Sequence, residues 1–253
     1  MKKSPSKKNA KQSQSPKNTA ILLAGGSGSR MRGTVKDKVL EPLLGLPVLM
    51  HSFKAFLESG QISQVVFVCR DNAQQKAIRK ALKEHFANVS KHISITFTDG
   101  GAERQDSVFN GLSQVSDQNG LAFIHDGARP LVGAENIVLL SAAAQKDGAS
   151  VLASKVVDTI KRVPASKKTE NVKLDDLDRS RLWAMQTPQV FNASEILSAY
   201  KFFKKNKLKI TDDVAAYTAY GKKVSIVENL NPNPKITVPQ DIAYIEFLET
   251  RKA

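Results

Sequence analysis

The sequence has almost no cysteine, few aromatic residues and no long apolar run. Cys69 is the only cysteine among 253 residues, which excludes an intrachain disulfide and makes a reducing compartment the simpler expectation. Aromatic residues make up 6% of the chain, fewer than the interleaved aromatics of a nucleic-acid-binding module would require. No apolar stretch approaches the roughly 18 residues that a membrane helix needs. We therefore expect a cytoplasmic protein with no specific nucleic-acid partner and no membrane partner.

Acidic residues are absent from the first 18 positions, which hold six lysines. This segment is rich in Lys, Ser, Gln and Asn and cannot bury enough apolar surface to fold, so residues 1–18 are predicted to be a disordered basic tail. It has neither the apolar core of a secretory signal nor the arginines of a transit peptide, although it leaves an organellar location open. Residues 19–253 are long enough for a single domain, and they carry the rest of the net charge of +14, which suits phosphate-bearing substrates.

The most informative stretch of the domain is its beginning. Residues 20–24 are an apolar run that predicts a buried parallel strand. Ala24 ends the run, and the next five residues are small enough for their backbone amides to line a concave anion site: Gly25, Gly26, Ser27, Gly28 and Ser29. Arg30 and Lys38 then supply two cations. The dinucleotide fingerprint lacks its third glycine here and the Walker A motif lacks its glycine-lysine pair, so the stretch predicts a polyphosphate loop of another kind. A glycine-rich surface turn with nearby cations is the alternative.

Apolar runs and helical periodicities alternate along the rest of the chain. Strands are predicted at residues 65–69, 93–97, 121–124 and 224–227, and helices at 47–58, 72–86, from Ser107, at 210–217 and from about Pro239. Residues 235–237 are expected to be extended. This alternation predicts an α/β fold that is Rossmann-like, with a mostly parallel central sheet between helices.

The carboxyl ends of parallel strands meet at one edge of such a sheet, where ligands bind. Gly101, Ala102 and Ser107 follow the strand at 93–97 and are candidates for a nucleotide contact, with a structural turn and helix cap as the alternative. Asp126 follows the strand at 121–124, where a carboxylate can hold Mg²⁺ beside a phosphate, unless it only caps a turn. The adjacent His125 is interpreted as structural.

The pattern changes at about residue 154. Residues 156–163 alternate like a strand, and a polar stretch then leads to an apolar return at 184–191. Residues of about 154–187 are thus predicted to form a β-arm that leaves the sheet and returns to it. Because little sequence is available to cover such an arm, we expect it to pack on a second copy of the chain as a homodimer.

Six further motifs follow the first loop in order. They are Asp99-Gly100-Gly101-x-x-Arg104-x-Asp106-Ser107-Val108, His125-Asp126-Gly127-Ala128-Arg129-Pro130, Asp158-Thr159-Ile160-Lys161, Leu182-Trp183-x-x-Gln186-Thr187-Pro188-Gln189, Ile210-Thr211-Asp212-Asp213 and Asn233-Pro234-Lys235-Ile236-Thr237. With this set the chain resembles the 2-C-methyl-D-erythritol 4-phosphate cytidylyltransferases of the non-mevalonate isoprenoid pathway, over about residues 19–250.

The resemblance implies a nucleotidyltransferase fold and a metal-dependent transfer, with Mg²⁺ or another divalent cation. The phosphate of methylerythritol phosphate would attack the α-phosphorus of CTP, giving 4-diphosphocytidyl-2-C-methyl-D-erythritol and pyrophosphate. By this resemblance Arg30, Lys38, Asp126 and Lys235 are catalytic, and Asp126 also faces the metal. The 24–29 loop would bind the triphosphate, and Gly101, Ala102 and Ser107 would lie by the cytosine. Arg129, Thr211 and Lys235 would bind the acceptor, which Thr159 and Arg179 would reach from the neighbouring subunit.

The chain departs from the family pattern in two places. Where the family commonly reads Pro-Lys-Gln, this chain has Lys36-Asp37-Lys38-Val39, one residue longer, and Lys38 is chosen over Lys36 because it keeps the family's spacing to Leu49. Ala102 stands where an acidic residue is often found, which leaves the strictness of the CTP preference open. A cytidylyltransferase for another sugar-alcohol phosphate, such as ribitol 5-phosphate, is the nearest alternative. A nucleotide-binding module without turnover is a more distant one.

Overall fold

The computed structural model describes residues 17–26, 37–87, 93–165, 169–208 and 210–251. Most of the predicted basic tail therefore lies outside the described residues. Its last two residues do not behave as a tail. The Lys17 amide donates to Asp117 Oδ2 at 3.1 Å, and Asn18 Oδ1 accepts from the Leu121 amide at 2.9 Å. The described part of the domain thus begins two residues before the predicted boundary. No helix within these ranges is long and apolar enough to span a membrane.

A seven-stranded sheet forms the centre of the molecule, with the strand order β11-β7-β10-β6-β1-β4-β5. Its members are β1 (Thr19–Leu23), β4 (Gln64–Cys69), β5 (Ser94–Asp99), β6 (Leu121–Asp126), β7 (Ala149–Lys155), β10 (Trp183–Asn192) and β11 (Ser225–Glu228). All neighbouring strands are parallel except β10, which runs antiparallel to both β6 and β7. The predicted α/β class with a mostly parallel sheet is confirmed.

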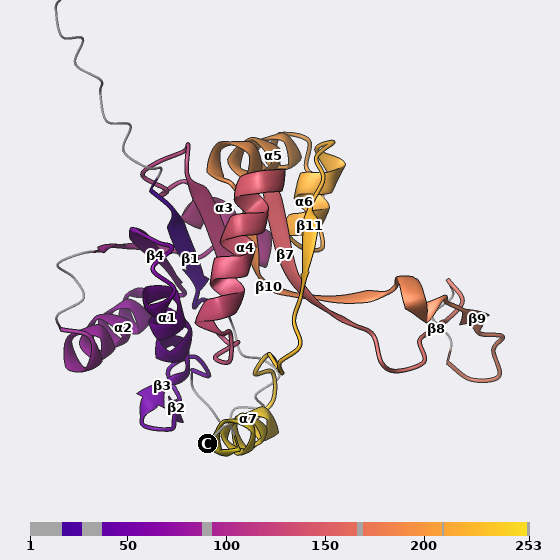
Figure 1. The fold of residues 1–253 in the computed structure, drawn as a ribbon, viewed down its shortest axis with the longest axis horizontal. Coiled ribbons are helices and arrows are strands. Elements are labelled where there is room, and N and C mark those ends of the chain that lie inside the picture. The colour runs from indigo at the N-terminus through magenta and orange to yellow at the C-terminus, as the bar shows by residue number, and fades with distance from the viewer. Residues whose placement is uncertain (1–16, 27–36, 88–92, 166–168, 209, 252–253) are drawn as a thin grey trace, which may run out of the picture.

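Two helical layers cover the sheet, and each packs on its own apolar cluster. The helices are α1 (Val48–Glu58), α2 (Asn72–His85), α3 (Arg104–Leu112), α4 (Ala134–Asp147), α5 (Ala193–Lys205), α6 (Asp213–Ala219) and α7 (Gln240–Thr250). Along β1, Ala20 and Leu22 point to the cluster that contains Phe53 of α1, while Ile21 points to the cluster that contains Val108 of α3. Figure 1 shows α1 and α4 in front of the sheet, with α3 and α5 behind it. Burial on both faces explains why the strands read as continuous apolar runs.

Several predicted element positions differ from those in the structure. Helix α3 begins at Arg104, three residues before Ser107, because Glu103 and Asp106 form a capping box there. Helix α6 spans Asp213–Ala219, with Asp212 as its N-cap, so the predicted segment at 210–217 began too early. Residues 156–163 contain only the short strand β8 (Lys161–Arg162). Residues 235–237 run between β11 and α7 without joining a sheet.

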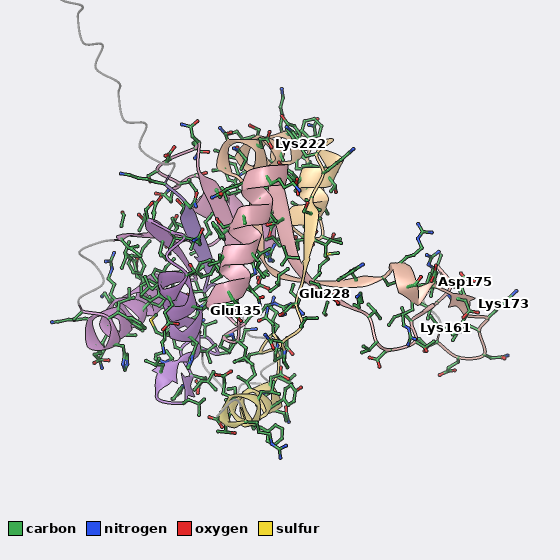
Figure 2. The ribbon with its side chains drawn as sticks, in the orientation of Figure 1. Glu135, Lys161, Lys173, Asp175, Lys222 and Glu228 are labelled. Atoms are coloured by element: carbon green, nitrogen blue, oxygen red, sulfur yellow. The ribbon has the colours of Figure 1, made fainter. Side chains whose placement is uncertain are left out.

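Residues 156–182 form an excursion between β7 and β10. Figure 1 shows it extending away from the rest of the molecule, with β8 and β9 (Asp175–Asp176) paired near its end. Lys161 and Asp176 form an ion pair there, and Figure 2 shows Lys161, Lys173 and Asp175 grouped at this end. Val157, near its base, is 79% exposed. The alternation at 156–163 thus has no sheet face to bury within the single chain, and the homodimer stays a prediction.

Candidate active site

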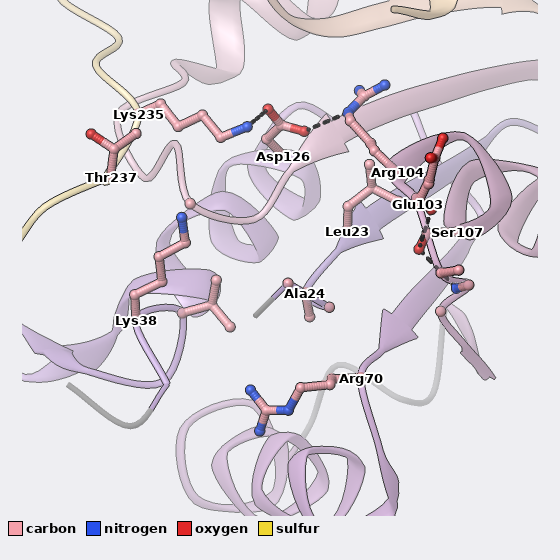
Figure 3. A pocket seen from close by; sticks show the side chains of 17 residues that line it. Leu23, Ala24, Lys38, Arg70, Glu103, Arg104, Ser107, Asp126, Lys235 and Thr237 are labelled. Atoms are coloured by element: carbon pink, nitrogen blue, oxygen red, sulfur yellow. Dashed lines mark hydrogen bonds and ion pairs between the residues drawn. The ribbon is translucent and has the colours of Figure 1, made fainter. Parts of the chain in front are cut away.

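A cleft with a volume of about 470 Å³ opens at the carboxyl ends of β1, β4, β5 and β6 (Figure 3). Nine of the predicted site residues line it: Ala24, Gly25, Gly26, Lys38, Gly101, Ala102, Ser107, Asp126 and Lys235. The parallel register brings them together, since Leu23 at the end of β1 pairs with Val68 on one side and with Asp126 on the other. Ser27, Gly28, Ser29 and Arg30 lie outside the described residues.

The first wall of the cleft is the start of the glycine-rich loop. The amides of Ala24 and Gly25 both donate to the Val68 carbonyl at 2.9 Å, which fixes the point where the chain leaves β1. A Cβ at Gly25 would lie 3.3 Å from the backbone nitrogen of Arg70, so a larger residue would crowd the adjacent strand end. The loop therefore starts in close backbone contact with β4.

The second wall is the turn from β5 into α3. Ser107 Oγ accepts a hydrogen bond from the Gly101 amide at 3.0 Å and donates one to the Glu103 carbonyl at 3.3 Å. A Cβ at Gly101 would lie only 2.1 Å from Asp106 Cβ, so this turn requires glycine. The Ser107 side chain holds the shape of the turn, while Ala102 is exposed at its tip.

Asp126 lies between two cations at the back of the cleft (Figure 3). Lys235 Nζ is 2.6 Å from Asp126 Oδ2, and Arg104 Nε is 3.3 Å from Asp126 Oδ1. The side chain is largely buried, which by itself raises the pKa of Asp126, but the charges of Arg104 and Lys235 outweigh burial and hold that pKa below its ordinary value. Asp126 is therefore a carboxylate throughout the physiological pH range.

Arg104 belongs to one of the six sequence motifs, but the sequence alone assigned it no role in the site. Its guanidinium makes a two-pronged contact with Asp213, at 3.1 and 2.8 Å, besides its contact with Asp126. Tyr200 donates a hydrogen bond to the same Asp213 carboxylate. Burial opposes the charge on Arg104, yet Asp213 and Asp126 raise its pKa above the ordinary value. The motif signal was an arginine directly at the helix start, beside the predicted nucleotide turn.

Lys38 reaches the cleft from the opposite side to Arg104. Its Nζ donates to the Ile236 carbonyl at 2.8 Å, next to Lys235, so two lysines that are distant in sequence approach the same place. Thr237 and Arg70 also line the cleft, and the sequence reasoning did not propose either. The described part of the site thus gathers Lys38, Arg70, Arg104 and Lys235 around one cavity, a charge pattern suited to a polyphosphate.

The predicted acceptor-binding residues are not all brought to the cleft. Arg129 lies behind it, where its Nη1 donates to the Asn233 carbonyl at 2.6 Å. Its Nε is buried and has no hydrogen-bond partner among the described residues. Thr211 lines a smaller depression beside Arg104 and Tyr200. Thr159 and Arg179 belong to the excursion and do not line the cleft.

His125 is structural, as interpreted from the sequence. It is fully buried, and burial lowers its pKa to about 4 although the neighbouring Asp126 acts to raise it. Both ring nitrogens lie 3.2 Å from hydrogen-bond partners, Ser52 Oγ and Thr187 Oγ1. The neutral imidazole therefore braces the end of β6 from within the core.

A divalent cation would find only part of its ligands in the protein. The described ranges contain no group of three or more His, Cys, Asp and Glu side chains placed to hold a metal. Asp126 is one cleft-facing carboxylate at the end of a strand. Mg²⁺ in phosphate sites is commonly bound by one or two carboxylates together with substrate phosphates and water, so Asp126 fits such an ion when a triphosphate is present.

Comparison with known proteins agrees with this geometry. The family model described as 2-C-methyl-D-erythritol 4-phosphate cytidylyltransferase (IspD) matches residues 19–251. The chloroplastic enzyme of that name from rice (Oryza sativa subsp. japonica) is 36% identical over 92% of this chain and 75% of its own length. The enzyme of that name from Bacillus mycoides is also 36% identical, over 92% of this chain and 99% of its own.

A solved structure has the same architecture. The crystal structure titled 4-diphosphocytidyl-2C-methyl-D-erythritol synthase from Anaerococcus prevotii superposes with a TM-score of 0.78 at 26% identity, covering 93% of this chain and 99% of that one. The shared fold, the matched length and the position of the cleft residues lead to one assignment. This chain belongs to the 2-C-methyl-D-erythritol 4-phosphate cytidylyltransferase family.

Proposed function

We propose that this protein transfers the cytidylyl group of CTP to 2-C-methyl-D-erythritol 4-phosphate, giving 4-diphosphocytidyl-2-C-methyl-D-erythritol and pyrophosphate for isoprenoid precursor synthesis. The observation that carries the proposal is the group of Lys38, Lys235 and Arg104 around Asp126, at the strand ends where a nucleotide binds in such folds. The family membership supplies the identities of the two substrates.

In the proposed reaction an oxygen of the acceptor phosphate forms a bond to the α-phosphorus of CTP. The bond from that phosphorus to the bridging oxygen breaks, and pyrophosphate leaves with the electron pair. No covalent enzyme intermediate is required, so the protein acts by positioning and by stabilising charge. Lys38, together with Arg30, would stabilise the charge that builds on the α- and β-phosphates. The amides of Gly26 and of the residues that follow would hold the triphosphate, whereas the amides of Ala24 and Gly25 already donate to the Val68 carbonyl.

Asp126 and Lys235 have linked roles in this proposal. Asp126 would hold a divalent cation, Mg²⁺ by preference, which would neutralise phosphate charge when bound. Lys235 is 33% exposed, so its ammonium can contact a phosphate while it remains within 2.6 Å of Asp126. A metal titration of turnover tests the requirement: activity that survives complete chelation of divalent cations would refute it.

The acceptor would be bound partly by a second copy of the chain. We propose a homodimer in which the excursion of one protomer brings Thr159 and Arg179 to the acceptor at its partner's cleft, where Arg129 and Thr211 complete the pocket. The exposure of the excursion supports this arrangement, because an extended ribbon gains stability by packing on a partner. Light scattering at micromolar concentration tests it, and a monomeric mass would refute it.

Subunit mixing tests the shared site. Arg179→Ala alone should impair use of the acceptor, and Lys38→Ala alone should abolish most turnover. If one site draws these residues from different protomers, mixed and reassociated variants should recover about a quarter of wild-type activity, since half of the dimers then carry one intact site of two. Mixed variants that stay as inactive as the separate ones would place Arg179 and Lys38 in the same protomer's site.

The primary experiment measures pyrophosphate release from CTP and Mg²⁺ with different acceptors. We expect turnover with 2-C-methyl-D-erythritol 4-phosphate and at least about 100-fold lower kcat/KM with ribitol 5-phosphate, equivalent to roughly 3 kcal/mol of discrimination. The other three nucleoside triphosphates test the effect of Ala102 on CTP preference. Turnover with ribitol phosphate alone would reject the proposed acceptor. A cytoplasmic location is proposed on the bacterial relatives, and the rice relative is named as chloroplastic.

A further inference from the structure

Asp37 precedes Lys38 and makes contacts that tie it to two other parts of the cleft wall. Its Oδ2 accepts from Gln74 Nε2 at 2.7 Å and lies 3.2 Å from Arg70 Nη2. Its Oδ1 lies 3.3 Å from the amide of Val39. The Asp37 side chain is only 12% exposed, so this is an anchored carboxylate and not a solvated one.

Gln74 connects these contacts to the beginning of the glycine-rich loop. It lies in the first turn of α2 and is 2% exposed. Besides Asp37, its Nε2 donates to the Ala24 carbonyl at 3.1 Å, and its Oε1 accepts from the Arg70 amide at 2.6 Å. One buried side-chain amide thus joins Ala24, at the start of the glycine-rich loop, and Asp37 to the end of β4. We call Asp37, Gln74 and Arg70 the anchor cluster.

The anchor cluster fixes the backbone position from which the Lys38 side chain extends. The Asp37 carbonyl accepts from the Leu40 amide at 3.0 Å, so the cluster continues directly into the turn that carries Lys38. On the other side of Lys38, the Val39 carbonyl accepts from the Leu49 amide at 2.9 Å, and Val39 is buried. The Lys38 backbone is therefore held from both neighbours, while its long side chain extends into the cleft (Figure 3).

Arg70 lines the cleft but is neutralised within the cluster. Its guanidinium is 3.2 Å from Asp37 and 2.8 Å from Asp71. Hydrogen bonding to Asp71 and the nearby charge of Asp37 raise the pKa of Arg70, so the group is a fixed cation between two carboxylates. The planar guanidinium of an arginine can contact two carboxylates in fixed directions, so it suits this structural role better than the single ammonium of a lysine would.

From this arrangement we infer that Asp37 is a positioning residue for Lys38, acting through Gln74 and Arg70. The inference rests on the proposed function, because it assigns a role within the same transfer reaction. The contacts of the Asp37 side chain to Gln74, to Arg70 and to the Val39 amide restrict the backbone next to Lys38.

The test is steady-state kinetics on the whole 253-residue chain, with CTP and 2-C-methyl-D-erythritol 4-phosphate as substrates. Asp37→Ala removes every side-chain contact to the cluster, and we expect kcat to fall about 10- to 100-fold because a displacement of about 1 Å can cost that much. KM for CTP should change less than about threefold, since the loop amides remain. Asp37→Asn keeps an acceptor for Gln74 and should recover at least part of the lost kcat.

Asp71→Asn is the matched control. Asp71 contacts the same arginine, but it is 45% exposed, and asparagine preserves its N-cap of α2. If Asp37 acted only by neutralising Arg70, both variants would lower kcat alike. We expect Asp71→Asn to retain wild-type kcat within about twofold, as surface ion pairs contribute little.

A double variant distinguishes positioning from general damage. In the Lys38→Ala background, Asp37→Ala should lower kcat by less than about threefold, because the group that it positions is already gone. Full, multiplicative losses in the double variant would overturn the inference, as would wild-type kcat in Asp37→Ala. If Asp37→Ala does not fold, Asp37→Ser, whose shorter side chain lacks the carboxylate that Gln74 and Arg70 contact, carries the same comparison. A wild-type protein that releases no pyrophosphate would instead reject the proposed function, so the two failures are distinguishable.

Discussion

Replacing Asp213 by asparagine should destabilise the protein through the arginine that it holds. Asp213 has no solvent-exposed surface, and both of its oxygens contact Arg104, at 3.1 and 2.8 Å. Removing one partner of a buried ion pair commonly costs about 3–5 kcal/mol, because the other charge remains without compensation. Arg104 is 33% exposed and keeps its contact with Asp126, so we expect the lower end of this range, about 3 kcal/mol.

Thermal unfolding followed by circular dichroism measures this loss. For a chain of this size, 1 kcal/mol shifts Tm by roughly 2–4 °C, so Asp213→Asn should lower Tm by roughly 6–12 °C. Tyr200→Phe removes only the hydroxyl that donates to Asp213 and should cost about 1 kcal/mol. Turnover should fall as well, because Arg104 then has Asp126 as its main remaining partner and competes there with Lys235.

An exposed ion pair provides the control for this prediction. Lys155 and Glu228 lie 3.0 Å apart with side chains that are 66% and 37% exposed, and Glu228→Gln should cost less than about 1 kcal/mol. The Asp213 side chain is fully buried and that of Glu228 is 37% exposed, so burial should account for most of the difference between the two variants. If Asp213→Asn and Glu228→Gln shift Tm by the same amount, burial of the Asp213 carboxylate does not control the stability of the Arg104 network.

Three further predictions test other parts of the protein. Gly101→Ala should raise KM for CTP by at least about fivefold, because the new Cβ would lie 2.1 Å from Asp106 Cβ and relieving such overpacking costs about 1–3 kcal/mol. Initial-rate kinetics at varied CTP concentration measure this KM, and an unchanged KM would show that the turn does not contact the nucleotide. Lys38→Ala and Arg30→Ala should each raise the barrier for turnover by about 3 kcal/mol while the affinity for CTP changes much less, as expected for charges that act in the transition state. Equal losses in kcat and in CTP affinity would assign these two residues to ground-state binding. In the folded state His125 stays neutral down to its pKa of about 4, whereas in the unfolded chain the same histidine takes up a proton near pH 6.5. The free energy of unfolding should therefore fall by about 3 kcal/mol as the pH drops from 6.5 to 4. Urea unfolding at several pH values measures this slope, and His125→Gln, which does not titrate, should flatten it.

The central strands and the residues at their carboxyl ends were predictable because the relevant signals are local. Residues 20–24 and 121–124 are continuous apolar runs, and both became buried strands that pair with each other. Since parallel strands end at one edge, their order alone placed Gly25 near Asp126. The residues that follow these strands were therefore identified without knowledge of tertiary contacts.

Helix α4 and the excursion show where local signals fail. Helix α4 was not predicted, because exposed Val138 and Leu139 interrupt the buried series Ile137, Leu140 and Ala144 and blur its amphipathic period. Residues 156–163 gave the opposite error. Their alternation suggested a strand, but alternation predicts a strand only where one face is buried, and the excursion offers no such face.

The electrostatic network lay beyond sequence reasoning for a different reason. Arg104 and Asp213 are 109 positions apart, and Asp37 and Gln74 are 37 apart. Each pair has one member in a loop or helix start whose position depends on how the layers pack. An arginine or aspartate in a polar segment has many possible partners, and only the folded chain selects one.

The cleft uses its two kinds of cation differently. Arg70 and Arg104, with rigid planar guanidinium groups, are each held by two carboxylates, and these contacts join β4, β6, α3 and α6 to the walls of the site. Lys38 and Lys235 have flexible stems and approach each other at the segment 235–237, where Lys38 Nζ contacts the Ile236 carbonyl and Lys235 Nζ contacts Asp126 Oδ2. Because Arg70 and Arg104 are each paired with two carboxylates, we expect the lysines, together with Arg30, to carry the phosphate chemistry. The arginines Arg70 and Arg104 fix the elements from which the lysines and Asp126 face the cleft. Loss of an acid that holds one of these arginines, such as Asp37 or Asp213, should therefore alter turnover although that acid does not contact the substrate.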